Sequence, residues 1–451
     1  MSDQPNVVVF FTDQQRWDTT GAHGNPMGLT PNYDRMAAEG THAAYAFTNQ
    51  PLCLPARSVL QTGRYSTQAG CPTNGAALPV GTRTLAHHFN EAGYVTGYLG
   101  KWHLCQCRTE PVPRELRGGY QEWLAANVPE MTSDAYRATL YDENDREVLL
   151  PGYRVDALTD AAIRFLDRHQ EEPFFLFCSF LEPHHQNPRD IFAAPVGYAE
   201  RYLDPWMPPD LRALGDRWPA RDLPGYYGIV KRLDEALGRV QDALLSLGLA
   251  ENTILIFSSD HGNHFRTRNA EFKRSCHEAS TRIPLALTGP GFVGGGQLPD
   301  LVSLIDLPPT LLDACGLPVP GDMLGRSLLS LTRGEREGWP EEVFIQISEA
   351  QVARAVRTHR WKYGVNAPRE HADWDQASSP VYEEEFLYDV IDDPYELTNL
   401  IQEESHRQVA EIMRGRLLRR MAEAEEPEPK IVEAQTRPSG QRVVSEAEAR
   451  G

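Results

Sequence analysis

Short apolar runs recur along most of the chain and alternate with segments of helical periodicity. The runs are almost continuously hydrophobic, which is typical of strands buried on both faces of a parallel sheet. They lie at residues 6–12, 94–99, 174–180, 253–259 and 285–288. Helices are predicted between and after them at 31–39, 84–92, 155–168, 226–247 and 303–314. This alternation predicts an α/β fold with a large mixed, mostly parallel sheet sandwiched by helices.

The pattern changes near residue 340, where shorter and more polar strands begin. They are predicted at 343–348, 353–357, 361–365 and 386–389, followed by a helix at about 406–424. We therefore expect a main α/β domain at 1–340, a smaller C-terminal α+β subdomain at 341–424, and an acidic tail at 425–451. The tail is rich in Glu, Pro and Arg and is predicted to be disordered. Residues 110–150 are polar and irregular, which indicates an insertion.

One segment, residues 50–64, combines a cysteine with helix signals and an arginine. Pro55 suits the start of a helix and Gly63 suits its end. Cys53 is therefore expected at a helix N-terminus, where unpaired N–H groups favour a nearby anion. Arg57 lies one turn further and adds a full positive charge. For a cysteine taken alone, a buried thiol beside a surface turn is the better interpretation.

Reactive side chains follow four of the predicted strands. Ligands bind at the carboxyl ends of the strands in open parallel sheets, so we expect these side chains to share one edge that Cys53 can reach. They are Asp13, Lys101 with His103, the doublet His184 and His185, and Asp260 with His261. The doublet leaves open which of its two histidines faces the site.

Three of these positions indicate a metal. Asp13, Gln14 and Asp260 offer hard oxygen ligands that suit Ca²⁺ or Mg²⁺, and His261 would add a nitrogen that suits Mn²⁺ better. A single Asp after a strand is more often a helix cap. Two of them on one predicted edge favour one divalent cation instead.

Charge and cysteine content narrow the class of protein. The net charge is −19 and no Lys- or Arg-rich block offsets it, so we expect no nucleic-acid partner. Residues 1–5 lack a basic region and a cleavage site, and no apolar run reaches the roughly 20 residues needed to span a bilayer. We expect a cytoplasmic protein with no membrane partner, whose seven scattered cysteines are free thiols. Cys105 and Cys107 are interpreted as structural.

The motifs, taken in order, resemble those of the type I sulfatases, a formylglycine-dependent family of the alkaline phosphatase superfamily. Cys53-Leu54-Pro55-Ala56-Arg57 resembles the family's C-x-P-x-R segment, whose cysteine is oxidised to formylglycine. The resemblance runs from about residue 6 to residue 400. Its other elements are Thr12-Asp13-Gln14-Gln15, Gly100-Lys101-Trp102-His103, Pro183-His184, Ser259-Asp260-His261-Gly262, Lys273 five residues before Glu278, Asp306-Leu307-Pro308-Pro309-Thr310, and Leu387-Tyr388-Asp389 with Asp393-Pro394.

The resemblance implies hydrolysis of sulfate esters, of a sulfated carbohydrate or a small organic sulfate. It implies formylglycine from Cys53, one divalent metal, most simply Ca²⁺ with Mn²⁺ or Mg²⁺ as alternatives, and a formylglycine-generating enzyme as partner. One hydroxyl of hydrated formylglycine would attack sulfur and the other would expel sulfate. The implied catalytic residues are Cys53, Arg57, Lys101, His103, His184 and Lys273; the implied substrate contacts are Lys101, His184, His185 and Lys273; the implied metal ligands are Asp13, Gln14, Cys53, Asp260 and His261.

Two departures keep alternatives open. Many sulfatases have Asp-Asp where this chain has Asp13-Gln14, and Asp-Asn where it has Asp260-His261. Gln and His at these positions also occur in phosphonate monoester and phosphodiester hydrolases of the same superfamily. A non-catalytic anion-binding protein with an unmodified Cys53 is a third interpretation, and assembly as a homo-oligomer is left open.

Overall fold

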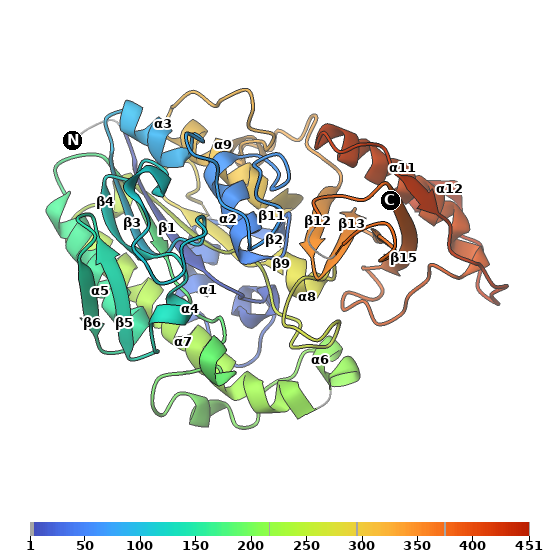
Figure 1. The fold of residues 1–451 in the computed structure, drawn as a ribbon, viewed down its shortest axis with the longest axis horizontal. Coiled ribbons are helices and arrows are strands. Elements are labelled where there is room, and N and C mark those ends of the chain that lie inside the picture. Colours follow the sequence, from blue (N-terminus) through green and yellow to red (C-terminus); the bar gives the residue numbers. More distant parts are fainter. Residues whose placement is uncertain (1–3, 216, 295, 374–375, 451) are drawn as a thin grey trace.

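Figure 1 shows a computed structural model of the chain, which describes residues 4–215, 217–294, 296–373 and 376–450. Within these residues, eleven strands form one mixed sheet in the order β11-β2-β10-β8-β1-β7-β3-β4-β5-β6, with β9 paired to β2. The consecutive neighbours β8, β1, β7, β3 and β4 are parallel. The strands are β1 (Asn6–Thr12), β2 (Thr41–Phe47), β3 (Val95–Lys101), β4 (Glu122–Ala126), β5 (Arg137–Asp142), β6 (Glu147–Pro151), β7 (Phe174–Ser179), β8 (Thr253–Ser259), β9 (Arg282–Ile283), β10 (Leu285–Thr288) and β11 (Gly296–Ser303).

Helices cover both faces of this sheet, because its central strands are apolar on both sides. Val7, Val9 and Phe11 of β1 belong to one hydrophobic core, and Val8 and Phe10 belong to the other. The first core also contains side chains of α2 (Cys53–Thr62), α3 (Leu85–Glu91) and α9 (Leu307–Ala314). The second contains side chains of α1 (Pro31–Glu39), α5 (Arg154–Arg168) and α7 (Arg217–Ser246). The predicted helix-sandwiched α/β fold is confirmed (Figure 1).

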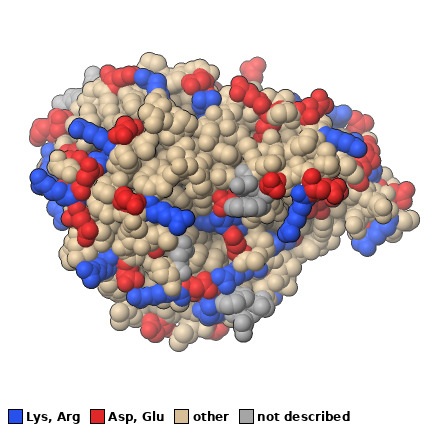
Figure 2. Space-filling view, viewed as in Figure 1, with Lys and Arg blue, Asp and Glu red and all other residues tan. Residues whose placement is uncertain are grey.

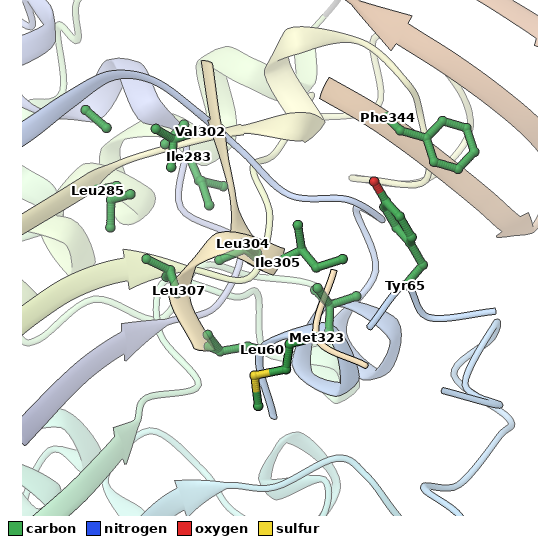
Figure 3. Packing of buried hydrophobic residues seen from close by; sticks show 14 of the residues in the cluster. Leu60, Tyr65, Ile283, Leu285, Val302, Leu304, Ile305, Leu307, Met323 and Phe344 are labelled. Atoms are coloured by element: carbon green, nitrogen blue, oxygen red, sulfur yellow. The ribbon is translucent and has the colours of Figure 1, made fainter. Parts of the chain in front are cut away.

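Helix α2 is held firmly, and this fixes Cys53 at its first residue. All ten of its residues are buried, and Gly63 ends it with φ 69°, in the left-handed region. Figure 3 shows Leu60 of this helix beside Met323, and Tyr65 directed toward Phe344. The rings of Tyr65 and Phe344 lie 5.4 Å apart, so the segment after α2 also contacts the second sheet.

A second sheet forms the smaller C-terminal subdomain that the sequence predicted. Its order is β12-β13-β14-β15-β16, antiparallel except for the last pair. Its strands are β12 (Val343–Glu349), β13 (Gln351–Arg357), β14 (Trp361–Asn366), β15 (Val381–Asp389) and β16 (Lys430–Val432). Helices α11 (Arg407–Glu423) and α12 (Glu446–Arg450) accompany it at the red end of the ribbon (Figure 1). Four short helices complete the described chain: α4 (Pro129–Thr132), α6 (Pro209–Leu214), α8 (Glu278–Thr281) and α10 (Leu329–Thr332).

The prediction of a disordered tail is wrong for residues 425–450. Strand β16 pairs with β15, and Val444 and Ala449 are buried. Both carboxylate oxygens of Glu426 accept hydrogen bonds from Nε of Arg354, at 2.9 and 2.8 Å, and Arg354 has no exposed surface. The prediction of disorder rested on the charge-rich composition of the tail. The charge of Glu426 is instead held by buried Arg354, which lies far away in the sequence.

The prediction of free thiols also needs a correction. Cys105 and Cys107 form a disulfide, with Cα atoms 5.5 Å apart, inside the range that a disulfide spans. Cys53, Cys71, Cys178, Cys276 and Cys315 are free and buried. The spacing of two residues suggested no redox motif, but a turn can bring such close neighbours together.

The surface mixes the two signs of charge. Figure 2 shows Lys and Arg interspersed with Asp and Glu over the visible face, with no continuous area of one sign. Among the described helices, none is both long and apolar enough to cross a membrane.

Candidate active site

The carboxyl ends of four adjacent parallel strands bring the predicted residues to one edge. Asp13 follows β1 and Asp260 follows β8, and the backbone N–H of Asp260 donates to Thr12 O at 3.2 Å. Lys101 ends β3, and His184 lies after β7, which separates β1 from β3. Strand register therefore places residues that are far apart in sequence within hydrogen-bonding distance.

Cys53 lies at the centre of this edge. Its Sγ is 2.8 Å from Nζ of Lys273 and 3.7 Å from Nζ of Lys101. The thiol is also 3.4 Å from Nε2 of His261. Burial raises the pKa of Cys53, but Lys101, Lys273 and His261 lower it by more than burial raises it, so the pKa is well below its usual value. A thiolate is thus the stable form of the unmodified side chain.

The groups beside Cys53 fit a hard divalent cation. Asp13, Cys53, Asp260 and His261 each offer one ligand atom, and these atoms lie within 4.8 Å of one another. Nδ1 of His261 donates to Gly262 O at 2.9 Å, which leaves Nε2 as a free electron pair. Both side-chain amide atoms of Gln14 are buried without a partner in the described chain, although its backbone N–H donates to Asp260 Oδ1 at 3.0 Å. A cation would satisfy the Gln14 oxygen.

The pKa values of Asp13 and Asp260 are shifted in opposite directions. Burial raises the pKa of Asp13, but the charges of Lys101 and Lys273 lower it well below its usual value. Burial and the Asp13 charge raise the pKa of Asp260 to about 7. Two acids this close cannot both ionise easily without compensation. A bound cation would supply it and favour the ionised form of both.

Arg57 and Lys101 tie these carboxylates to the neighbouring strands. Nη2 of Arg57 donates to Asp13 Oδ2 at 3.0 Å and to Asp260 Oδ2 at 3.1 Å. Nζ of Lys101 lies 2.9 Å from Asp13 Oδ2. Nη1 of Arg57 donates to Lys101 O at 3.1 Å and to Ser179 Oγ at 2.6 Å. These bonds fix the ligand oxygens before any ion binds.

Of the two neighbouring histidines, His184 is the one that contacts Lys273. Its Nδ1 donates to His185 O at 2.8 Å, so Nε2 accepts from Nζ of Lys273 at 3.1 Å. Burial and Lys273 lower the pKa of His184, so the ring is neutral. His185 is stacked behind it, with ring centroids 4.6 Å apart and the second ring against Phe272.

Gln14 and His103 both have positive φ, 70° and 52°, a backbone strain that is concentrated at functional sites.

These residues open into a pocket of about 370 Å³. Cys53, His103, His184, His185 and Lys273 line it. The pocket also contains residues that the sequence did not single out: Asn74, Glu130, Arg266, Ala270, Glu271, Phe272 and Arg274.

Glu130 is the most informative of the missed residues. It lies in α4 just beyond β4, the neighbour of β3, and its Oε1 accepts from Nζ of Lys101 at 3.0 Å. The interval 110–150 looked like an irregular insertion, whereas its strands β4, β5 and β6 extend the main sheet. Recognition of β4 from the apolar residues Trp123 to Ala126 would have brought Glu130 to the same edge by the strand-end rule.

Fold and site together define an α/β protein with a group of potential metal ligands that includes a cysteine at a helix N-terminus. The sulfatase family model matches residues 5–317, and a model for the C-terminal region of N-sulphoglucosamine sulphohydrolase matches residues 270–423. The chain belongs to the sulfatase family and is therefore an enzyme that acts on sulfate esters. This excludes the non-catalytic interpretation.

Similar proteins cover almost the whole chain. The ulvan-active sulfatase of Formosa agariphila is 28% identical over 93% of this chain and 81% of its own length. An arylsulfatase of Clostridium perfringens is 27% identical over 94% of this chain and 95% of its own length. The structure of the phosphonate monoester hydrolase of Agrobacterium radiobacter has a TM-score of 0.72 at 23% identity, covering 93% of this chain and 96% of the other. That likeness shows that the two chains share a fold.

Proposed function

We propose that this enzyme hydrolyses the sulfate ester of a carbohydrate or small organic alcohol, with formylglycine at position 53 and one divalent metal. The observation that carries the proposal is the position of Cys53. Its Sγ lies 2.8 Å from Nζ of Lys273 and within 4.8 Å of the potential metal-ligand atoms of Asp13, Asp260 and His261. The ulvan-active sulfatase and the arylsulfatase support the two substrate classes.

The metal would be held by Asp13, Gln14, Asp260 and His261 together with residue 53. Bound there, the cation supplies Lewis-acid charge and formylglycine supplies a geminal diol as nucleophile. The three oxygen ligands support Ca²⁺, and the nitrogen of His261 supports Mn²⁺ as the alternative. A cytoplasmic location and a formylglycine-generating enzyme as partner are part of the same proposal.

The positive side chains of this site hold the anion. Lys273 and Lys101 approach position 53 from the pocket and from β3, so their ammonium groups can bind the sulfate oxygens as negative charge develops on them. Arg57 holds the carboxylates that face the cation. These contacts exist before substrate binds, which is the condition for electrostatic stabilisation without reorganisation.

Proton transfer is assigned to His184 and His103, two of the three histidines that line the pocket. His184 carries its proton on Nδ1 and accepts a hydrogen bond at Nε2, where Lys273 can deliver a proton toward the leaving alcohol. A hydrogen bond from the His103 side chain helps to lower the pKa of Cys53, so this ring is assigned to support the nucleophile at position 53. His185 supports His184 by stacking and borders the substrate.

A phosphonate monoester or phosphodiester hydrolase is the second candidate. Gln14 and His261 support it, because Gln and His at these two positions resemble the hydrolases of that class. The buried Lys101 and its carboxylate partners Asp13 and Glu130 remain compatible with either anion.

Mass spectrometry and paired assays test the proposal. The chain is produced with and without a formylglycine-generating enzyme, and the Cys53 peptide is compared with the peptides of Cys71, Cys178, Cys276 and Cys315 as internal thiol controls. We expect the aldehyde only at position 53, and hydrolysis of aryl sulfates only in the modified sample. Activity that does not change with modification contradicts the nucleophile. A higher kcat/KM for aryl phosphonate monoesters than for aryl sulfates selects the second candidate.

A further inference from the structure

Glu130 lines the pocket and carries one carboxylate oxygen that has no partner among the described residues. Its side chain is buried, with 5% exposure, and it lines the pocket together with Cys53, His103 and His184. Oε1 accepts from Nζ of Lys101, at 3.0 Å. Oε2 is buried and has no hydrogen-bond partner in the described residues. Half of this carboxylate is therefore satisfied by the protein and half is not.

The unsatisfied oxygen belongs to an ionised group. Burial raises the pKa of Glu130, but the charge of Lys101 lowers it below its usual value. A buried carboxylate oxygen without a donor is costly, so a donor that enters the pocket gains a charge-assisted hydrogen bond. The sulfate group cannot be that donor, because its oxygens only accept. The donor must come from the alcohol part of the substrate.

The position of Glu130 relative to the metal cluster also favours the alcohol part. Nζ of Lys101 contacts Asp13 Oδ2 on one side and Glu130 Oε1 on the other, so Glu130 lies one side chain beyond the cluster. The backbone of α4 is held there, since Nε2 of Gln186 donates to Glu130 O at 3.4 Å and to O of Ser133, the residue after the helix, at 2.7 Å. A sulfate held at Lys101 and Lys273 thus places the atoms bonded to its ester carbon near Glu130.

We propose that Glu130 is a specificity-determining residue that accepts a hydrogen bond from a hydroxyl or ammonium group on the carbon next to the sulfated carbon. The substrate class is then a sulfate ester of a vicinal diol or amino alcohol. The inference rests on the proposed sulfatase function. It differs from a purely structural role, in which Glu130 only holds Lys101.

A pair of substrates separates these two roles. Phenyl sulfate and catechol monosulfate differ by one hydroxyl next to the ester, and kcat and KM are measured for both with the modified holoenzyme. The variants are Glu130→Gln and Glu130→Ala, with Glu147→Gln on exposed strand β6 as the matched control. In Glu130→Gln the amide oxygen retains Lys101, and its NH₂ group replaces the anionic acceptor, so the substrate hydroxyl can only accept a neutral hydrogen bond and the charge-assisted one is lost. Thermal unfolding and metal content show that each variant is folded and loaded.

The ratio of kcat/KM for the two esters is the readout. We expect the native enzyme and Glu147→Gln to prefer catechol monosulfate by about tenfold or more, equivalent to about 1.4 kcal/mol. Both Glu130 variants should lower this preference toward one, while any loss through Lys101 affects both esters equally. An unchanged preference in Glu130→Gln, or no preference in the native enzyme, overturns the inference while leaving the sulfatase function intact. Hydrolysis of neither ester by formylglycine-bearing enzyme counts against the proposed function itself, and this inference falls with it.

Discussion

Replacement of Lys273 by Met removes one positive charge from the reaction centre with little other change. Nζ of Lys273 lies 2.8 Å from Cys53 Sγ, 3.1 Å from His184 Nε2 and 3.2 Å from His261 Nε2. Burial lowers its pKa, but Cys53 and Asp13 raise the pKa above its usual value, so the side chain is an ammonium ion. Methionine has a similar length and no charge.

The structure gives the size and the direction of the effect. Removal of one preorganised donor from a developing oxyanion costs about 2.7–4 kcal/mol, or 10²–10³ in kcat. Among the described residues, no carboxylate lies within ion-pair distance of Lys273, whereas Lys101 is paired with Asp13 and Glu130. Loss of Lys273 therefore strands no buried acid. The free energy of unfolding should stay the same or rise, because a buried charge has been removed.

The assay is steady-state hydrolysis of an aryl sulfate, beside urea unfolding and metal analysis. Lys430→Met, at an exposed position of β16, is the matched control. We expect kcat/KM to fall about 100- to 1000-fold in Lys273→Met, with full metal content and full modification of Cys53. A fall of less than about tenfold in a folded, loaded and modified variant would refute the placement of Lys273 at the transferring group.

Three further predictions concern the tail, pH and the metal. Glu426→Gln should lower the free energy of unfolding in urea by about 3–5 kcal/mol, because it leaves buried Arg354 without its counter-charge. The double change Arg354→Met with Glu426→Leu should recover most of this loss. A loss below about 1 kcal/mol in Glu426→Gln means that the tail is not anchored as described. Burial and Arg282 lower the pKa of His42 to about 4 from 6.5, so only the unfolded chain binds this proton in that interval. The stability that His42 contributes is therefore present above pH 6.5 and is lost as pH falls, by about 1.4 kcal/mol per pH unit. His42→Phe should make the free energy of unfolding less dependent on pH between 4 and 6.5. An unchanged slope of the free energy of unfolding against pH contradicts this. Gln14→Ala should weaken metal binding at least about tenfold, measured as metal retained after dialysis against a chelator; equal retention removes Gln14 from the ligand set.

Much of the site was predictable because parallel strands impose a simple rule. A polar residue that follows a buried strand reaches the carboxyl edge of the sheet, and strands that are distant in sequence share that edge. Asp13, Lys101 and Asp260 each follow an apolar run, so one rule groups them. The rule failed only where the strand itself was not recognised. Strand β4 is short and lies in a polar interval, so Glu130 went unseen.

Other features depended on contacts that no local pattern records. The order of residues 425–450 follows from Arg354, which is buried on β13 and needs an acid that the sequence places 72 positions later. The doublet His184 and His185 has no internal asymmetry in the sequence. Only the hydrogen bond from Lys273 Nζ to His184 Nε2 distinguishes the two rings.

The sequence by itself determined the α/β class, the helix that begins at Cys53, and the inventory of acids, amines and imidazoles at the strand ends. Hydrophobic periodicity and helix-end residues are local properties, so they can be recognised without coordinates. Only the tertiary structure decided the geometry around Cys53: a lysine at 2.8 Å, four potential ligand atoms within 4.8 Å of one another, and a half-satisfied Glu130. Those distances arise from strand order and helix packing, which bring together residues as distant in sequence as Gln14 and Asp260, 246 positions apart.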